Sequence, residues 1–356
     1  DLETAIEISA HTTEREILRS RSLSEMVLAI QYALTGQLGR SEQMGWQAHQ
    51  DARRIHSMYA ESNALVALSM ATYYQGKFEE CDQLIRKGLS ISEPLHYWRN
   101  VGYLQNFKSF LCMSMGDLDS AWLATLETQK NIEKYNTQDL LASYWLMRGN
   151  LFGYLRDVSS AIDCYKKGQA LAIDFHMSLE NQAQLARTLV SSGDLQEGGN
   201  QFEQVLSTSK RVGLGLIYFR AAVNWLALRS AIQTPEQILM EADELENEIG
   251  DLRIAPLLTL INLSRATAYL KTGNTDRGFF YANLFEQEAD RSKISSLDFT
   301  YLYSHKQIAA LSQQPLNPGV RARILQRLQH LEQHTHQPEL RPLFDNFQAK
   351  ILADLQ

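Results

Sequence analysis

The chain has 356 residues, of which 44% are hydrophobic and 21% charged, and its formal net charge is −7. With only 7 prolines and 19 glycines, this composition is that of a folded protein and excludes disordered and collagen-like chains. The mild acidity argues against a nucleic-acid-binding surface, and three cysteines are too few for a disulfide framework.

The first residues of the sequence predict that any targeting segment was removed or never existed. From Asp1 onward, it lacks the charged segment followed by an apolar run that marks a secretory leader. The longest apolar stretches, such as residues 254–263, are far shorter than the roughly 20 residues needed to cross a bilayer. We therefore expect a soluble cytoplasmic protein, or a soluble piece of a larger one.

A six-residue phrase recurs along the chain: a glycine, a polar residue, an apolar residue, two polar residues and a small residue. Copies begin at Gly36, Gly76, Gly116, Gly193 and Gly273, and Arg156 replaces the glycine in a further copy. From 36 to 156 the step is 40 residues each time, the next step is 37, and the step from 193 to 273 is two periods. The missing copy falls near residues 234–235, and an eighth period ends just before residues 317–318; both are polar-Pro pairs typical of helix starts. The period predicts about eight repeats.

Each repeat contains two amphipathic stretches on either side of the phrase, for example residues 60–74 and 78–90. No stretch alternates apolar and polar residues convincingly, so strands are not expected. Antiparallel helices approach closely only where small side chains lie at their crossing, and a glycine between them permits the positive φ that ends the first helix. We therefore predict helix–turn–helix units that cross at small residues, namely Ala29, Ser69, Ser109, Gly149, Ala186 and Ala266 on the first helices and Ser41, Cys81, Ala121, Ala161, Gly198 and Gly278 on the second.

The two ends of the chain differ from the repeats. Residues 1–16 have apolar residues that predict a capping or linker helix. Near the other end, Leu340, Phe344, Phe347 and Ile351 form one stripe, which predicts a final helix that covers the last repeat. The predicted division is a capping or linker helix at 1–16, eight repeats at 17–333 and a C-terminal capping helix at 334–356.

The paired helices, the small residues at their crossings and the glycine-polar-apolar turns resemble tetratricopeptide repeats (TPRs). The usual unit of that family has about 34 residues, so a unit of about 40 implies that each helix pair is longer by about a turn and a half. Repeat length and number also resemble the TPR sensor domain of MalT-like bacterial transcription activators. The resemblance implies an all-α fold, a right-handed α-solenoid of about eight TPR-like repeats, in which the first helix of each pair lines a concave groove.

Motifs for catalysis are not found. The chain has no Gly-x-x-x-x-Gly-Lys-Ser/Thr loop, no Gly-x-Ser-x-Gly turn and no His-Glu-x-x-His helix. Cys81 and Cys164 occupy positions of small buried residues, which favours packing over a nucleophilic role. His334 and His336 form a close pair, but no third ligand is spaced to complete a metal site. The acidic run 241–248 alternates with apolar residues at helical spacing, which favours a solvated helix face over a cation site. We expect no enzymatic activity, cofactor or metal.

Groove-facing positions, transferred from the TPR family by counting back from each turn, give ten candidate binding residues. They are Asn63, Tyr73, Tyr74, Tyr103, Asn106, Phe110, Asn150, Tyr154, Arg187 and Arg220. Such side chains combine flat apolar area with hydrogen-bonding tips, which suits protein segments, peptides and sugars. The alternative is that they pack between repeats. Repeats one and seven carry Leu23, Met26, Ile30, Leu260 and Leu263 at equivalent positions, which indicates packing between superhelical turns or against a neighbour.

Two hypotheses for function follow. The first is a non-catalytic sensor or regulatory part of a larger bacterial signal-transducing transcription regulator, which binds a protein, a peptide or a small effector such as a sugar in its groove. From this segment itself, the hypothesis expects no contact with nucleic acid or membrane. The second is a protein–protein interaction scaffold with no small-molecule effector. The resemblance to sensor domains favours the first.

Overall fold

The computed structural model describes residues 2–9, 14–230, 232–250, 252, 254, 257–292, 306, 309–311 and 318–355. Within these ranges the regular structure is helical and contains no strand, in agreement with the predicted all-α solenoid. No helix in the described part of the chain is long and apolar enough to cross a membrane. Of the predicted helix start at residues 317–318, residue 317 lies outside the described residues, and a helix begins at Pro318 as predicted.

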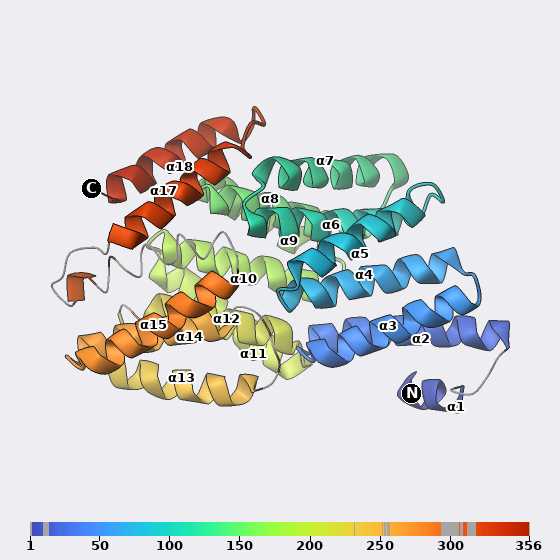
Figure 1. Ribbon diagram of the computed structural model, residues 1–356, viewed down its shortest axis with the longest axis horizontal. Coiled ribbons are helices and arrows are strands. Elements are labelled where there is room, and N and C mark those ends of the chain that lie inside the picture. Colours follow the sequence, from blue (N-terminus) through green and yellow to red (C-terminus); the bar gives the residue numbers. More distant parts are fainter. Residues whose placement is uncertain are drawn as a thin grey trace.

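Helices follow one another as antiparallel pairs along the chain (Figure 1). The pairs are α2 (Arg15–Leu34) with α3 (Leu38–Arg54), α4 (Met58–Tyr74) with α5 (Phe78–Ser92), α6 (Trp98–Met115) with α7 (Leu118–Tyr135), α8 (Leu141–Tyr154) with α9 (Val158–Leu171), α10 (Phe175–Ser191) with α11 (Leu195–Val212), α12 (Gly215–Arg229) with α13 (Pro235–Ile249), and α14 (Leu257–Lys271) with α15 (Thr275–Ser292). The short helices α1 (Leu2–Ile8) and η1 (Gln138–Leu140) precede α2 and α8, and α17 (Pro318–Glu332) and α18 (Arg341–Asp354) follow the pairs.

The turn inside the pairs has the predicted conformation. The φ angle is positive at each predicted turn glycine, for example 86° at Gly36 and 99° at Gly193, and it is 60° at Arg156. The next residue donates its backbone N–H to the carbonyl five positions earlier at 2.7–3.0 Å, as for Gln37 to Tyr32. This Schellman closure satisfies carbonyls at the helix end. The recurring phrase is therefore a helix stop followed directly by a helix start.

The predicted crossings are also confirmed, since all twelve small residues are buried. A Cβ atom on Gly198 would lie 3.0 Å from the backbone oxygen of Ala186, on the partner helix. In the second repeat, the Cys81 thiol donates to the Ser69 carbonyl at 3.4 Å. Larger side chains at these points would separate the two helices of a pair.

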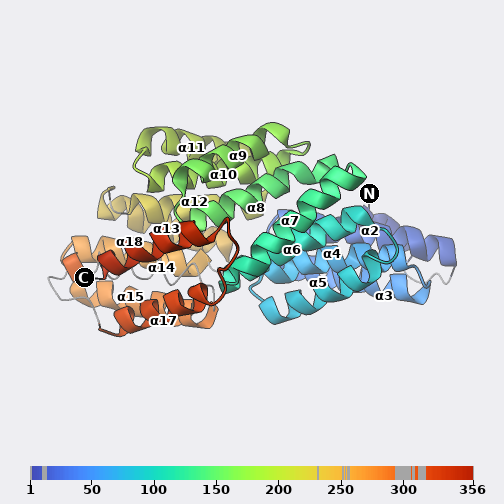
Figure 2. The same cartoon turned by 90° about the horizontal axis from the view of Figure 1, so that it is seen from above.

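The solenoid is wound tightly enough that its early and late repeats touch (Figures 1 and 2). One apolar cluster joins Ala33, Leu38 and Met70 of the first two repeats to residues of α12, α13 and α14. Ile30 and Leu260 both pack against it, as predicted for side chains between superhelical turns. The N-terminus of α12 also abuts the turn after α2. Much of the inner surface is therefore filled by the protein itself.

The last two helices pack back on the middle of the chain. Phe344, Phe347 and Ile351 of α18 share an apolar cluster with residues of α7, α8 and α17, and all three are fully buried. The loop between α17 and α18 is held by Asp119, whose carboxylate accepts the backbone N–H groups of His336 and Gln337 at 2.7 and 2.9 Å. Residues 1, 10–13 and 356 lie outside the described part, and the three-part division of the chain stays a prediction.

A buried charge cluster links the N-terminal segment to the first repeat. Arg21 is 5% exposed; its guanidinium donates to the Asp51 carboxylate and, at 2.6 Å, to the carbonyl of Ser9. Glu25 is 1% exposed, lies 3.6 Å from Arg21 Nε, and its Oε2 has no hydrogen-bond partner among the described residues. Burial, as the main cause, and the Asp51 carboxylate, as the second, raise the pKa of Glu25 to about 8. Arg21 and Arg54 act to lower it.

We expect Glu25 to make the stability of the fold depend on pH. Since its pKa is near 4.5 when unfolded and about 8 when folded, the folded state binds more protons between these values, and stability falls as pH rises from 4.5 to 8. Glu25→Gln removes this loss. The free energy of unfolding of the variant minus that of wild type should therefore rise by about 2–4 kcal/mol from pH 5 to pH 8.5. Urea denaturation of both proteins at the two pH values measures the gain. A difference that is the same at both pH values would contradict the assigned shift.

Candidate functional site

A polar cluster lies where α4, α10 and α12 meet inside the superhelix. Arg220 Nη1 donates to Glu180 Oε1 at 2.7 Å, and the guanidinium carbon lies 5.3 Å from the centre of the Tyr74 ring. The Glu180 side chain is 8% exposed and that of Arg220 28%. We call Tyr74, Glu180 and Arg220 the Arg220 cluster. It connects the second, fifth and sixth repeats.

The surroundings of this cluster keep Arg220 charged and the neighbouring rings uncharged. Burial opposes the charged form of Arg220, but the Glu180 carboxylate and the neighbouring tyrosines outweigh it, so the pKa of the guanidinium lies above its ordinary value. Burial raises the pKa of Tyr73 and of Tyr74, so both phenols stay neutral. Burial also lowers the pKa of His176, although the carboxylates of Glu180 and Asp174 act to raise it. At neutral pH the cluster is an ion pair among neutral rings.

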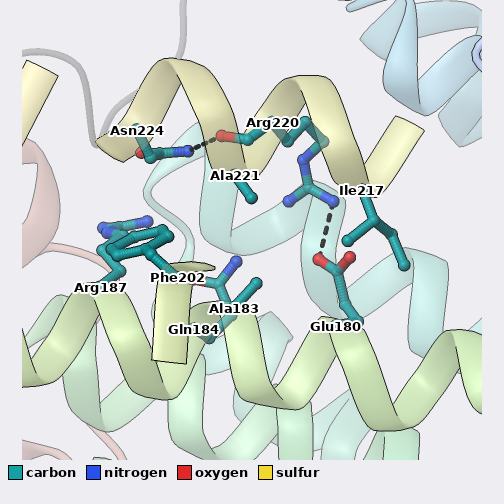
Figure 3. A pocket seen from close by; sticks show the side chains of 9 residues that line it. All are labelled: Glu180, Ala183, Gln184, Arg187, Phe202, Ile217, Arg220, Ala221 and Asn224. Carbon is teal, nitrogen blue, oxygen red and sulfur yellow. Dashed lines mark hydrogen bonds and ion pairs between the residues drawn. The ribbon is translucent and has the colours of Figure 1, made fainter. Parts of the chain in front are cut away.

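A pocket opens beside the Arg220 cluster (Figure 3). It is lined from α10, α11 and α12 by Glu180, Ala183, Gln184, Arg187, Phe202, Ile217, Arg220, Ala221 and Asn224. Its water-accessible space is about 10 Å³, about what one water molecule needs. Arg187 is exposed, and no hydrogen bond or ion pair joins it to another residue in the described ranges. The pocket thus offers a free cation beside an ion pair.

Five of the ten residues singled out by repeat register lie around this region. Tyr74 contacts Arg220, and Arg187 and Arg220 line the same pocket. The Tyr73 ring packs against that of Phe110 at 6.0 Å and against Tyr74 at 5.2 Å. These residues come from repeats two, three, five and six.

Two asparagines are engaged in helix packing. Asn106 is 4% exposed; its amide nitrogen donates to Ser143 Oγ at 2.6 Å and its amide oxygen accepts from Thr128 at 3.1 Å. Asn150 accepts from the Tyr165 hydroxyl at 2.9 Å. Both amides hold neighbouring helices together, so we leave them out of the site.

The remaining three candidates lie apart from the pocket. Asn63 donates to a carbonyl one turn earlier in its own helix at 3.0 Å. Tyr103 donates to Asp139 at 3.1 Å, at the junction of the third and fourth repeats. Tyr154 packs against Phe347 of α18, with ring centres 6.3 Å apart. None of the three lines the pocket.

Repeat register contained a signal for pocket residues that the sequence reasoning missed. Glu180 precedes Arg220 by 40 residues, one repeat, and so holds the same position in its helix. Gln184 and Asn224 are related in the same way. The position that selects Asn63 and Arg220 therefore also selects Glu180.

The cysteines and histidines singled out from sequence take part in packing and in contacts within the fold. Cys81 and Cys164 are buried, and burial raises the pKa of their thiols to about 12 and about 11, so they stay protonated. His336 Nδ1 lies 2.8 Å from Asp119 Oδ2, whereas His334 Nδ1 lies 2.8 Å from the His330 carbonyl. In the part of the chain that the structure describes, no group of three or more metal-ligating side chains is found.

The acidic run 241–248 forms the outer face of α13, with Ala242 and Ile249 buried beneath it. Two of its carboxylates, Asp243 and Glu246, pair with Arg265 of α14. The run is thus a solvated face with ion pairs between helices.

Comparison with known proteins supports the fold. No protein-family model matches the chain, and no curated protein does. Among solved structures, it is similar to a signal transduction ATPase with numerous domains (STAND) from Pyrococcus horikoshii that has a tetratricopeptide repeat sensor, with a TM-score of 0.53 and 12% identity over 96% of this chain. It is also similar to a Rap protein complexed with competence and sporulation factor, with a TM-score of 0.57 and 8% identity over 94% of this chain.

The lengths of these similar proteins differ. The chain spans 51% of the STAND protein and 99% of the Rap protein. At such low identity the likeness concerns the fold. Together with the repeated helix pairs and their crossings, it shows that the chain is a tetratricopeptide-like α-solenoid.

Proposed function

We propose that this solenoid is a non-catalytic binding domain that recognises a segment of a protein or peptide at the pocket of repeats five and six. The observation that carries the proposal is Arg187, an exposed cation with no partner in the described ranges, next to the Arg220–Glu180 pair. Arginine binds planar acidic groups through two parallel hydrogen bonds. Gln184 adds an amide group that can hold a peptide backbone, and Asn224, whose amide nitrogen donates to the Arg220 carbonyl at 2.7 Å, adds an amide oxygen that can accept from one.

The shape of the pocket favours an extended segment over a small effector. A sugar is bound in a concavity that encloses most of its surface, whereas this pocket has room for about one water molecule. A peptide needs no enclosed cavity, because it can lie across the mouth and place single side chains in it. We therefore favour a protein or peptide ligand over a sugar.

The similar structures support a regulatory role. One is named for its TPR sensor and the other was solved as a complex with a factor. We propose that this chain is likewise the sensor part of a larger cytoplasmic regulator of transcription. The reading frame is then expected to continue into a nucleotide-binding and a DNA-binding module. A frame that encodes only the repeats would favour the scaffold hypothesis.

A peptide selection tests the binding site. Random 12-residue peptides displayed on phage are selected for binding to the immobilised protein. The selected peptides are then synthesised, and their dissociation constants are measured by calorimetry. For Arg187→Ala we expect affinity at least tenfold weaker, because a charge-assisted contact at the centre of an interface is lost. The matched control is Arg211→Ala, an exposed arginine on α11 of the same repeat, which should bind like wild type. Equal affinities for both variants would place the binding site elsewhere.

A further inference from the structure

A second arginine site lies on α7, α8 and α9, helices that do not line the pocket. The guanidinium carbon of Arg148 is 5.2–5.8 Å from the centres of four aromatic rings, those of Trp122, Tyr144, Trp145 and Phe152. Its Nη1 donates to the Tyr144 hydroxyl at 2.8 Å. We call these residues the Arg148 site.

The Arg148 site lacks the acidic partner that other arginines in this protein have. Arg21 pairs with Asp51, Arg220 with Glu180, Arg229 with Glu241, and Arg265 with Asp243 and Glu246, and all four of these arginines are buried or half-buried. Arg148 is half-buried as well, yet in the described ranges no carboxylate lies within ion-pair distance of it. Aromatic faces compensate a cation only partly. Arg148 is therefore a half-buried cation whose charge is offset by aromatic rings alone among the described residues.

Two hydrogen-bond donors at the site also lack an acceptor. Arg148 Nε and Trp122 Nε1 are both buried, and neither has a partner among the described residues. Trp122 itself is 3% exposed, and its ring lies against the guanidinium. Buried polar groups in folded proteins are nearly always satisfied, so this orphaned pair marks the Arg148 site as unusual. Because both atoms are enclosed by protein, a ligand that comes from outside reaches the remaining, half-buried part of the guanidinium.

A further cation continues the site toward solvent. Lys167 of α9 is exposed, and its Nζ lies 4.7 Å from the centre of the Trp145 ring, so that this ring contacts two cations. In the described ranges Lys167 forms no ion pair. Asp163, one turn earlier on α9, is exposed and contributes the nearest negative charge on that helix.

We infer that the Arg148 site binds a carboxylate group, presented by an acidic side chain of a protein partner. A carboxylate is planar and acceptor-only, so it suits the half-buried guanidinium of Arg148 together with the exposed ammonium of Lys167. A protein source is favoured because Trp145 and Arg148 are half-buried, and Trp and Arg are among the residue types that dominate protein interfaces. The same chemistry would accept a free carboxylic acid. This inference is independent of the pocket on repeats five and six.

Indole N–H signals of the intact protein test the inference. The chain has five tryptophans, and Trp122→Phe identifies the signal of Trp122 in a ¹H–¹⁵N spectrum. The probes are the peptide Ac-Ala-Glu-Ala-Glu-Ala-NH2, its counterpart with glutamine in place of glutamate, and sodium glutarate as a free acid. We expect the glutamate peptide to move the Trp122 signal in a saturable way, because the Trp122 ring lies against the guanidinium, and the glutamine peptide to leave it unchanged.

Variants separate a binding role of Arg148 from a structural one. Arg148→Met keeps the aliphatic stem and should weaken the response to the glutamate peptide at least tenfold, whereas the exposed control Arg211→Met should leave it unchanged. Lys167→Met, at an exposed position that does not risk the fold, should weaken it several-fold. A response to glutarate but not to the peptide would overturn the protein source and keep the carboxylate. No response to either, or responses equal for glutamate and glutamine, would overturn the site.

Discussion

Gly215→Ala is expected to lower the free energy of unfolding by about 1–3 kcal/mol. Alanine favours a helix over glycine, so the isolated helix α12 would gain from the change. In the folded protein, however, the added methyl group would lie well inside contact distance of the Thr35 carbonyl oxygen, in the turn after α2. Because the atoms in contact belong to the backbone of both segments, no flexible side chain can move to make room. The loss therefore measures the contact between the first and sixth repeats.

The matched control is Gly39→Ala in α3, where nothing lies within 4 Å of the added atom. This change should stabilise the protein by about 0.5–1 kcal/mol through the lower entropy of the unfolded chain. Urea denaturation followed by circular dichroism measures both variants, and small-angle X-ray scattering reports any opening of the superhelix. If Gly215→Ala is as harmless as the control, the two superhelical turns do not touch in solution.

Arg220→Met is expected to destabilise the protein by about 2–4 kcal/mol. The methionine preserves much of the side-chain volume, but it leaves the Glu180 carboxylate, 8% exposed, without its cation. Removing one partner of a buried ion pair is strongly unfavourable, because the remaining charge has lost the interaction that offset its desolvation. The partial exposure of Arg220, at 28%, places the expected loss toward the lower end of such measurements.

A double-mutant cycle isolates the pair. Glu180→Gln removes the orphaned charge, so the double variant should recover at least about 1 kcal/mol relative to the sum of the two single changes. Denaturant unfolding of the four proteins at pH 7 measures the coupling. Additivity within about 0.5 kcal/mol would mean that Arg220 and Glu180 act independently, and the Arg220 cluster would then not connect the repeats.

Part of the candidate site was accessible from the sequence. Counting positions back from the turns selected Tyr74 and Arg220, which lie in contact although they belong to repeats two and six. The same counting selected Asn106, whose amide is fully engaged inside the helix packing. A register position specifies the face of a helix. It does not specify whether that face meets solvent, a neighbouring helix or a later turn of the superhelix.

The local architecture was determined by the sequence itself. Positive φ at the turn glycines, small residues at the crossings and amphipathic helices are properties of segments of about 40 residues, and each recurs in the repeats. Steric freedom at glycine and close packing at small side chains act over such short distances, so pattern alone predicts them.

Only the tertiary structure decided how much of the inner surface is left open. The contacts of Thr35 with Gly215 and of Tyr74 with Arg220 depend on how the small rotation between successive repeats accumulates over four or five units. No single residue encodes that sum, because it arises from the packing of every interface between repeats. The pocket beside Arg187, the Arg220–Glu180 ion pair and the Arg148 site are decided instead by how neighbouring repeats pack, which the register of one helix also leaves open.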